Sequence, residues 1–373
     1  YWYTRNMSMI SFLIKPASSL CNLRCKYCFY ADVSQNREMA SMGIMQEEVM
    51  HALIDKALQV PVDTIQFSFQ GGEPTCAGIA FFEAFIAYVN KKNVMKKNIQ
   101  YSMQTNGTLL DEKWIQLLKE NEFLVGVSID GFVKNHDWFR KDAQGKGTHK
   151  KILYTLRLLK NAGIAYNILT VLTKQLSKKP EELYRFYTEL GYPYVQIIPC
   201  LPSLKGNEPS DAFALEPKDF ALFYQRFFDL WYTDFMQGNY RSVLLFDSLM
   251  QMYCGKLPQQ CGMMGRCSMQ MVLEANGDVY PCDFFVLDEY RCGNICTDAI
   301  EDMIQGKAAK KFLHEEKRMC SLCKTCRFVH MCHGNCKRMN VCYFNDTYCG
   351  YKAFLEYIEE RMFVIAKRIR ISG

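Results

Sequence analysis

Cysteine is the residue type in this sequence with the greatest capacity for chemistry. The chain of 373 residues contains 18 cysteines, and three of them stand in a Cys-x3-Cys-x2-Cys loop at Cys21, Cys25 and Cys28. Three thiolates in one tight loop can bind three irons of a cubane cluster and leave the fourth iron open to another ligand. A zinc knuckle that lacks its fourth ligand, or three unrelated cysteines, would have the same spacing. The loop alone therefore leaves iron, zinc and no metal as alternatives.

A second set of cysteines is concentrated in the C-terminal third of the chain. Its members are Cys267-x14-Cys282, which includes Gly277-x4-Cys282, then Cys323-x2-Cys326-x5-Cys332-x3-Cys336, and then Cys349. Zinc ribbons use similar Cys-x2-Cys pairs, so zinc is the alternative to iron here as well. Both sets have the short spacings that metal sites need.

The composition favours metal binding over disulfide bonds. Disulfide-rich proteins are usually small and secreted, whereas this chain is long, and its first apolar run, Met9–Ile14, lacks the charged region and cleavage site of a signal peptide. The 45 Lys and Arg against 39 Asp and Glu give a net charge of +6, which is too mild and too scattered to indicate a nucleic-acid partner. No stretch approaches the ~20 apolar residues that cross a bilayer. We therefore expect a cytoplasmic protein that binds neither nucleic acid nor membrane.

The first half of the sequence alternates apolar runs of strand length with longer helical stretches. The expected strands are residues 8–14, 64–69, 99–103, 123–129, 165–172 and 194–198. The expected helices between them are residues 46–59, 78–91, 112–120, 148–161 and 179–190. Repeated strand–helix units predict an α/β fold with a parallel sheet, an open or closed barrel whose chemistry lies at the carboxyl ends of the strands.

The alternation stops at about Pro217. A long aromatic helix is expected at residues 218–236, a Cys-rich region extends from Cys261 to Cys349, and an amphipathic helix at residues 351–369 closes the chain. These changes of pattern predict three parts, which are a barrel over residues 1–217, a helical linker over residues 218–260 and a Cys-rich domain over residues 261–373.

The loop at Cys21, Cys25 and Cys28, with the aromatic Tyr27 before its last cysteine, resembles the signature of the radical S-adenosylmethionine superfamily. That superfamily folds as a partial (β/α)6 barrel, in agreement with the six expected strands. The stretch Gln70-Gly71-Gly72-Glu73-Pro74 is similar to the superfamily's GGEP motif, whose backbone meets the amino group of the cofactor's methionine. By itself this stretch would indicate only a turn after a strand. The resemblance implies these cofactor-binding residues: Tyr27, Gly72, Glu73, Ser128, Arg140 and Leu201.

The C-terminal cysteine pattern resembles the SPASM extension, which carries auxiliary iron–sulfur clusters in peptide-modifying radical enzymes. Adding Cys261 gives eight ligands, enough for two fully ligated four-iron clusters that suit electron transfer or structure. The resemblance assigns the first auxiliary cluster to Cys261, Cys267, Cys282 and Cys336. It assigns the second to Cys323, Cys326, Cys332 and Cys349, which makes three [4Fe-4S] clusters in all. Of the seven remaining cysteines, which are expected to be small buried hydrophobes, Cys320 and Cys342 lie close enough to the pattern to exchange with an assigned ligand.

Several stretches resemble the anaerobic sulfatase-maturating enzymes, from about residue 11 to residue 365. They are LIKPASSLCNLRCKYCFY, FQGGEPTCAG, QTNGTL, VGVSIDG, CGMMGRC and VYPCDFFVLD. Those enzymes oxidise a Cys or Ser of a sulfatase, within a Cys/Ser-x-Pro-x-Arg motif, to the aldehyde Cα-formylglycine. The resemblance implies that a 5′-deoxyadenosyl radical takes a β-hydrogen from that residue, and that a flavodoxin or ferredoxin donates electrons. The segment between Cys336 and Cys349 is shorter than the family pattern leads us to expect. This difference weakens the assignment of Cys349 as the last ligand.

The same resemblance assigns roles near the substrate. It makes Asp283, which directly follows Cys282, the base that takes the proton of the substrate thiol or hydroxyl. A single Asp in a loop is more often a cap or a solvated charge, so this role depends on the resemblance. The residues implied near the peptide are Tyr30, Gln70 and Gln104.

Two other functional classes are compatible with the sequence. One is a radical enzyme that installs a thioether or carbon–carbon crosslink in a ribosomal peptide, although such enzymes often carry an N-terminal leader-binding domain, and only about 20 residues precede Cys21. The other is a non-enzymatic iron–sulfur or zinc scaffold that binds a partner through an aromatic surface, since aromatic residues make up 14% of the chain. The scaffold class leaves the GGEP-like stretch and the three-cysteine loop without a purpose.

Overall fold

The computed structural model describes residues 8–372, and the chain divides into two compact units that each combine separate segments. The first unit comprises residues 1–128, 140–166 and 268–315, and the second comprises residues 129–139, 167–267 and 316–373. The predicted parts 1–217, 218–260 and 261–373 follow changes of sequence pattern rather than compactness, and they stay a prediction. Residues 1–7 and 373 of those parts lie outside the described residues.

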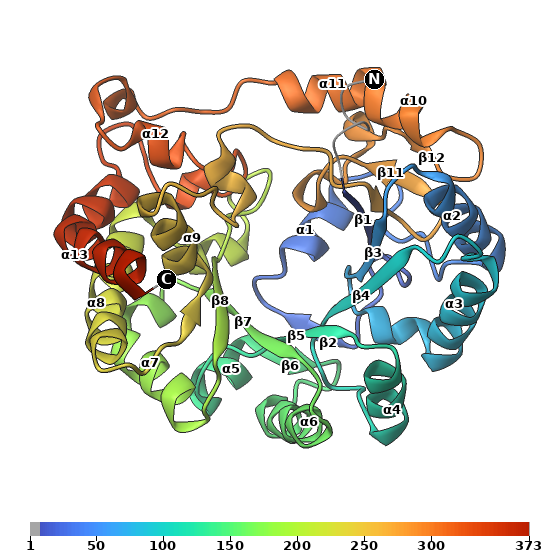
Figure 1. Ribbon diagram of the computed structural model, residues 1–373, viewed down its shortest axis with the longest axis horizontal. Coiled ribbons are helices and arrows are strands. Elements are labelled where there is room, and N and C mark those ends of the chain that lie inside the picture. The colour runs from blue at the N-terminus through green and yellow to red at the C-terminus, as the bar shows by residue number, and fades with distance from the viewer. Residues whose placement is uncertain (1–7, 373) are drawn as a thin grey trace. The chain divides into compact units, whose positions relative to one another are not determined.

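The first unit is built on a mostly parallel sheet. Its strands are β1 (Met9–Ile14), β3 (Thr64–Phe69), β4 (Asn98–Thr105), β5 (Leu124–Ser128), β10 (Val272–Leu273), β11 (Asp278–Tyr280) and β12 (Gly293–Asn294). Their order is β12-β11-β10-β1-β3-β4-β5, and only β11 and β12 pair antiparallel to their neighbours (Figure 1). Ile14 pairs with Phe69, and Phe69 pairs with Met103. The carboxyl ends of β1, β3 and β4 therefore share one edge, where parallel α/β sheets bind their ligands.

The helices of the first unit lie between these strands or follow them in the chain. They are α1 (Phe29–Gln35), α2 (Glu47–Gln59), α3 (Ile79–Lys92), α4 (Glu112–Glu120), α6 (His149–Ala162), α10 (Ile300–Gln305) and α11 (Lys307–His314). α2 buries Met50, Leu53, Ile54 and Leu58, at the spacing that gives a helix one apolar face. Figure 1 shows α2 and α3, which contact each other, flanking β3 and β4. A short antiparallel pair of β2 (Leu23–Cys25) and β6 (Arg140–Asp142) is separate from the main sheet.

The second unit combines three parallel strands with an aromatic helical core. The strands are β7 (Tyr166–Leu172), β8 (Tyr194–Pro199) and β9 (Ser242–Val243). The helices are α5 (Val133–Phe139), α7 (Pro180–Glu189), α8 (Pro217–Met236), α9 (Leu244–Tyr253), α12 (Val329–Cys332) and α13 (Gly350–Ser372). The buried Phe228 of α8 packs edge-on against Phe246 of α9 at 5.2 Å between ring centroids, and Phe246 stacks on Phe354 of α13 at 6.2 Å. The aromatic residues of α8 thus form a core rather than the surface that a scaffold would need.

The regular elements agree closely with the sequence prediction. The six expected strands correspond to β1, β3, β4, β5, β7 and β8, and the expected helices correspond to α2, α3, α4, α6, α7, α8 and α13, with ends that differ by a few residues at most. The strands that were not predicted, β2, β6 and β9 to β12, have two or three residues each, too few to show an alternating pattern. No helix within residues 8–372 is long and apolar enough to cross a membrane.

Candidate functional site

The N-terminal cysteine loop (Cys21, Cys25 and Cys28) lies between the carboxyl end of β1 and the start of α1. Cys28 is the N-cap of α1, and its sulfur accepts a hydrogen bond from the Ala31 amide at 3.4 Å. The sulfur of Cys21 accepts a hydrogen bond from the Leu23 amide, also at 3.4 Å. These two hydrogen bonds hold the sulfurs of Cys21 and Cys28 in fixed positions on the loop.

The three thiols of the loop interact electrostatically. Burial raises the pKa of the Cys21 thiol to about 12, and the nearby Glu73, Cys25 and Cys28 raise it further while the Leu23 amide lowers it. Bringing several thiolates together in a partly buried site requires a positive charge among them. An iron–sulfur core provides that charge, and three ligands leave one iron of a four-iron core open. The loop therefore fits the predicted cluster.

The Gly-rich turn after β3 packs against the start of this loop. A Cβ atom on Gly72 would lie 2.2 Å from the carbonyl oxygen of Leu20, so only glycine permits this approach. The Glu73 amide donates to the same oxygen at 2.8 Å. The carboxylate of the buried Glu73 accepts hydrogen bonds from the Thr105 hydroxyl and the Asn106 amide, both at 2.7 Å. Burial raises the pKa of Glu73 and these hydrogen bonds oppose the rise, so this carboxylate ties the turn to the end of β4.

The other predicted cofactor residues lie around the same strand ends or in the second unit. The guanidinium of the buried Arg140 donates to the Tyr27 hydroxyl at 3.1 Å. Ser128, the last residue of β5, accepts a hydrogen bond from the Gln104 side chain of β4 at 3.1 Å. Leu201 is buried shortly after β8 in the second unit. All the predicted cofactor residues except Leu201 thus belong to the first unit.

The predicted base lies at the carboxyl ends of β1 and β3. The Asp283 Oδ1 atom is 2.5 Å from the Nζ atom of Lys15, the first residue after β1. Its Oδ2 atom accepts a hydrogen bond at 2.6 Å from the side chain of Gln70, the first residue after β3. The Lys15 side chain is 0% exposed and that of Asp283 is 11% exposed. The fold therefore brings the predicted base into contact with Gln70 and also with Lys15, which was not predicted to lie there.

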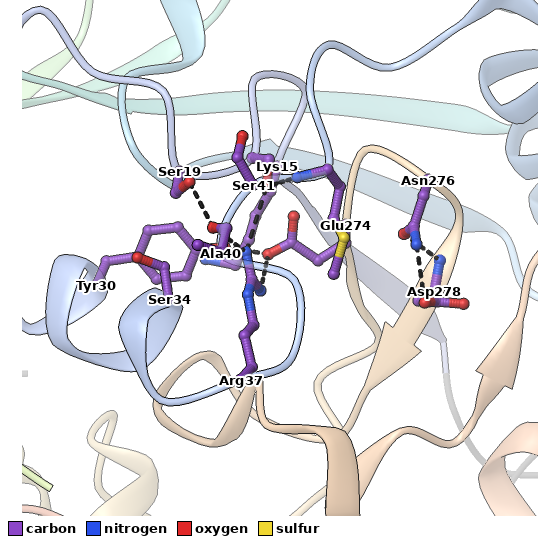
Figure 2. A network of polar contacts seen from close by, with 12 residues as sticks. Lys15, Ser19, Tyr30, Ser34, Arg37, Ala40, Ser41, Glu274, Asn276 and Asp278 are labelled. Atoms are coloured by element: carbon purple, nitrogen blue, oxygen red, sulfur yellow. Dashed lines mark hydrogen bonds and ion pairs between the residues drawn. The ribbon is translucent and has the colours of Figure 1, made fainter.

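Lys15 is surrounded by a buried polar network (Figure 2). Its ammonium lies 3.8 Å from the centroid of the Tyr30 ring, a geometry that attracts a cation to an aromatic face. The Tyr30 hydroxyl and the Arg37 guanidinium both donate to Oε1 of Glu274, the residue that follows β10. Burial raises the pKa of Tyr30 well above its usual value, and the Glu274 carboxylate adds to the effect. Tyr30, predicted to lie near the peptide, therefore directs its hydroxyl to Glu274 and its ring face to Lys15.

The second auxiliary set forms a site within the second unit. Its four cysteines line one small hollow together with Phe328 and Leu355, and we call it the four-thiol hollow: Cys323, Cys326, Cys332 and Cys349. The amide of Lys352 donates to the Cys349 sulfur at 3.3 Å. Four thiolates with an apolar lining suit a fully ligated cluster that carries electrons and excludes other ligands.

The two neighbouring cysteines that could have replaced an assigned ligand make hydrogen bonds to backbone carbonyls instead. The buried Cys320 donates its thiol to the Asn345 carbonyl at 3.2 Å, and the buried Cys342 donates to the Cys200 carbonyl at 3.5 Å. Neither lines the four-thiol hollow. Among residues 8–372, no group of three or more His, Cys, Asp or Glu is arranged to hold a single metal ion.

Three of the four cysteines of the first auxiliary set lie together in the second unit. Burial raises the pKa of Cys261, and the nearby thiols of Cys336 and Cys267 add to the rise. A Cβ atom on Gly262 would lie 2.9 Å from the Cys336 amide nitrogen, so the two loops are in contact. The fourth predicted ligand, Cys282, belongs to the first unit, and the complete ligand set stays a prediction.

Comparison with known proteins decides the family. The radical SAM superfamily matches residues 16–187, and the iron–sulfur cluster-binding SPASM domain matches residues 261–327. The chain is 39% identical over 369 residues to the cysteine-type anaerobic sulfatase-maturating enzyme of Clostridium novyi, covering 97% of this chain and 99% of the relative. The chain belongs to the anaerobic sulfatase-maturating enzymes. The predicted fold class, the radical S-adenosylmethionine chemistry and the iron–sulfur cofactors are thereby confirmed.

Two further comparisons agree with this family. The serine-type anaerobic sulfatase-maturating enzyme of Bacteroides thetaiotaomicron is 30% identical over 342 residues, which are 87% of this chain and 82% of that enzyme. The solved structure of native anSMEcpe with bound AdoMet and Kp18Cys peptide has 37% sequence identity and a TM-score of 0.89, covering 96% of this chain and 99% of that one. The structural likeness therefore extends over nearly the whole chain.

Sequence reasoning missed the residues that surround the predicted base. Lys15, Arg37 and Glu274 carry no spacing pattern, and Glu274 is 237 residues away from Arg37. One signal was available for Lys15, because a charged residue directly after the first strand lies at the edge where catalytic residues gather. No comparable signal marks Arg37 or Glu274, whose pairing arises only when β10 is placed beside β1.

Proposed function

We propose that this enzyme oxidises a cysteine in a Cys-x-Pro-x-Arg motif of a sulfatase polypeptide to Cα-formylglycine. The observation that carries the proposal is the Asp283 carboxylate, which lies at the carboxyl ends of β1 and β3 with one oxygen against Lys15 and the other against Gln70. Cysteine is preferred over serine in this proposal because the cysteine-type relative is more similar than the serine-type one. We further propose that the enzyme works in the cytoplasm with an electron donor of the flavodoxin or ferredoxin type.

The proposed reaction removes two electrons from the substrate residue. A hydrogen atom leaves the β-carbon, a proton leaves the thiol and one electron leaves with it, so that a carbon–sulfur double bond forms; water then replaces the sulfur and hydrogen sulfide departs. Asp283 takes the thiol proton as general base, a role that requires it within hydrogen-bond reach of the reacting group. Gln70 and Gln104 contact the peptide near that residue. Tyr30 does not contact the peptide in this proposal; its ring holds the Lys15 ammonium in place.

The protein's residues position the reacting groups and exclude water from them. We assign Cys21, Cys25 and Cys28 to the cluster that faces S-adenosylmethionine, and the two SPASM sets to the auxiliary clusters; when bound, these groups supply the adenosyl radical and accept the electron. Lys15 keeps the Asp283 carboxylate in one orientation, because its own ammonium is enclosed by Tyr30 and has no exposed surface. A rotamer held from two sides is the preorganisation that efficient proton transfer requires.

A peptide assay tests the proposal. The chain is reconstituted with iron and sulfide under anaerobic conditions and incubated with S-adenosylmethionine and a peptide containing Cys-x-Pro-x-Arg. We expect one 5′-deoxyadenosine, one aldehyde and one sulfide for each peptide converted. A peptide with Ala in place of the Cys is the control and should yield no aldehyde. A product that loses two hydrogens but retains its sulfur would instead identify an enzyme that forms thioether crosslinks.

A further inference from the structure

Lys317 lies between the cysteine segments of the two auxiliary sets. Its Nζ atom donates hydrogen bonds to the Gly265 carbonyl and the Asn335 carbonyl, each at 3.3 Å. Gly265 stands between Cys261 and Cys267 of the first set. Asn335 stands in the short linker that joins Cys332 of the second set to Cys336 of the first. One ammonium group therefore ties together the segments that carry ligands of both sets.

The position of this ammonium is fixed by backbone geometry. The linker residues His333, Gly334 and Asn335 have φ values of 46°, 74° and 56°, and such a run of left-handed residues is rare outside tightly specified turns. A Cβ atom on Gly334 would lie 2.3 Å from the Met319 sulfur and 3.7 Å from Cε of Lys317. The segment that carries Lys317 thus packs directly on the linker at Gly334, whose positive φ favours glycine.

Thiols of both auxiliary sets influence the pKa of Lys317. Burial lowers the pKa of Lys317, and the thiols of Cys267, Cys332, Cys336 and Cys323 oppose that effect. Among the side chains of residues 8–369, which are those described, Lys317 has no ion-pair partner. A half-buried cation without a counter-charge is unfavourable, and the cysteines that interact electrostatically with Lys317 belong to both ligand sets. The site is therefore complementary to two negatively charged neighbours.

We propose that Lys317 is an electrostatic bridge between the two auxiliary clusters and raises the reduction potential of both. A cluster bound by four thiolates becomes more negative when it takes up an electron, and a fixed positive charge nearby stabilises that reduced form. Each cluster exchanges one electron, and no bond is made or broken at Lys317. The inference rests on the proposed assignment of the eight cysteines. In it, Lys317 adjusts the reduction potentials of the clusters and does not contact the substrate.

The test is a potentiometric titration followed by electron paramagnetic resonance. The parent carries Cys21→Ala, Cys25→Ala and Cys28→Ala, so that only the auxiliary clusters contribute. In that parent, Lys317→Gln removes the charge and keeps a donor for the two carbonyls, Lys317→Met removes both, and Lys317→Arg keeps the charge. Lys324→Met is the matched control, because Lys324 lies between Cys323 and Cys326 but is exposed, where water and salt screen its charge.

Both charge-removing variants should disfavour reduction of both clusters about tenfold, equal to about 59 mV for a one-electron couple. In Lys317→Arg and Lys324→Met, the reduction potentials of both clusters should change by only a small fraction of that shift. If Lys317→Met loses iron, Lys317→Gln carries the comparison. Unchanged potentials in iron-replete Lys317→Gln, or a shift in only one cluster, would overturn the bridge. Absence of auxiliary signals in the parent itself would instead refute the cysteine assignment on which the bridge depends.

Discussion

The N-terminal cysteine loop and the four-thiol hollow use the same ligand for opposite purposes. The loop offers three thiols at the carboxyl end of β1, and its sulfurs accept hydrogen bonds from the Leu23 and Ala31 amides in partly exposed surroundings. The hollow offers four thiols and is lined by apolar side chains such as Phe328 and Leu355. A cluster with a missing protein ligand can bind a substrate, whereas a fully ligated one can only exchange electrons. The number of cysteine ligands and the lining of the site, rather than the type of ligand, therefore distinguish the two sites. The loop suits formation of the radical, and the hollow suits removal of the electron.

The two regions also differ in how charge is arranged around them. Near the loop, the ends of β1 and β3 carry the ion pair of Lys15 and Asp283 together with Gln70. Near the hollow, Lys352 is one of the lining residues, and Lys317 interacts electrostatically with thiols of both auxiliary sets. The first arrangement can accept a proton, and the second can only stabilise an electron. This difference predicts that variants in the two regions will separate the steps of the reaction.

The largest expected effect comes from removing the open ligand set. Replacing Cys21, Cys25 and Cys28 by Ala should remove about one third of the bound iron, because one of three four-iron clusters is lost, and should abolish formation of 5′-deoxyadenosine. Iron analysis and chromatography of the nucleoside products measure both quantities. Cys254→Ala, at a cysteine with no assigned role, is the control and should retain iron and activity. Cleavage of S-adenosylmethionine by the triple variant would break the distinction between the two regions.

The next largest effect concerns the four-thiol hollow. Cys326→Ala should lose iron from the second auxiliary site and abolish aldehyde formation, while S-adenosylmethionine still binds to the N-terminal loop and is cleaved slowly. Cys320→Ala is the matched control, because Cys320 is buried beside the same segment but bonds to the Asn345 carbonyl instead of lining the hollow. Iron content and aldehyde yield are compared for the two variants. Normal aldehyde formation without the auxiliary iron would show that the hollow is dispensable for electron removal.

A smaller effect is expected at Lys15. Lys15→Met leaves the Asp283 carboxylate without its cationic partner, so aldehyde formation should slow by about 10–100-fold, as for other residues that position a functional group. Breaking a buried ion pair should also lower the free energy of unfolding by about 3 kcal/mol, measured by anaerobic thermal unfolding. The double variant Lys15→Met, Asp283→Asn removes both charges and should regain part of this stability without regaining activity. A double variant no more stable than Lys15→Met would show that the two residues are not coupled.

The parts of this molecule that repeat along the sequence were predictable, and the parts that depend on distant pairing were not. Residues 64–69 alternate polar and apolar side chains and form β3 with the predicted bounds. Cysteine spacing led to the set Cys323, Cys326, Cys332 and Cys349, which lines one hollow. By contrast, Glu274 and Asp283 reach β1 only because the two-residue strand β10 pairs with it. A strand that short has no periodicity to detect, so neither the network around Lys15 nor the position of Lys317 could be read from local pattern.

The most direct test of the proposed chemistry compares the parent enzyme with Asp283→Asn on a peptide whose target cysteine is deuterated at the β-carbon. Both proteins should transfer deuterium into 5′-deoxyadenosine, because the hydrogen is abstracted from carbon and the carboxylate takes no part in that step. Only the parent should form aldehyde at full rate, since loss of a general base typically slows its step by about 10²–10⁴-fold. Equal rates of aldehyde formation in the two proteins, or an adenosine product free of deuterium, would contradict the account.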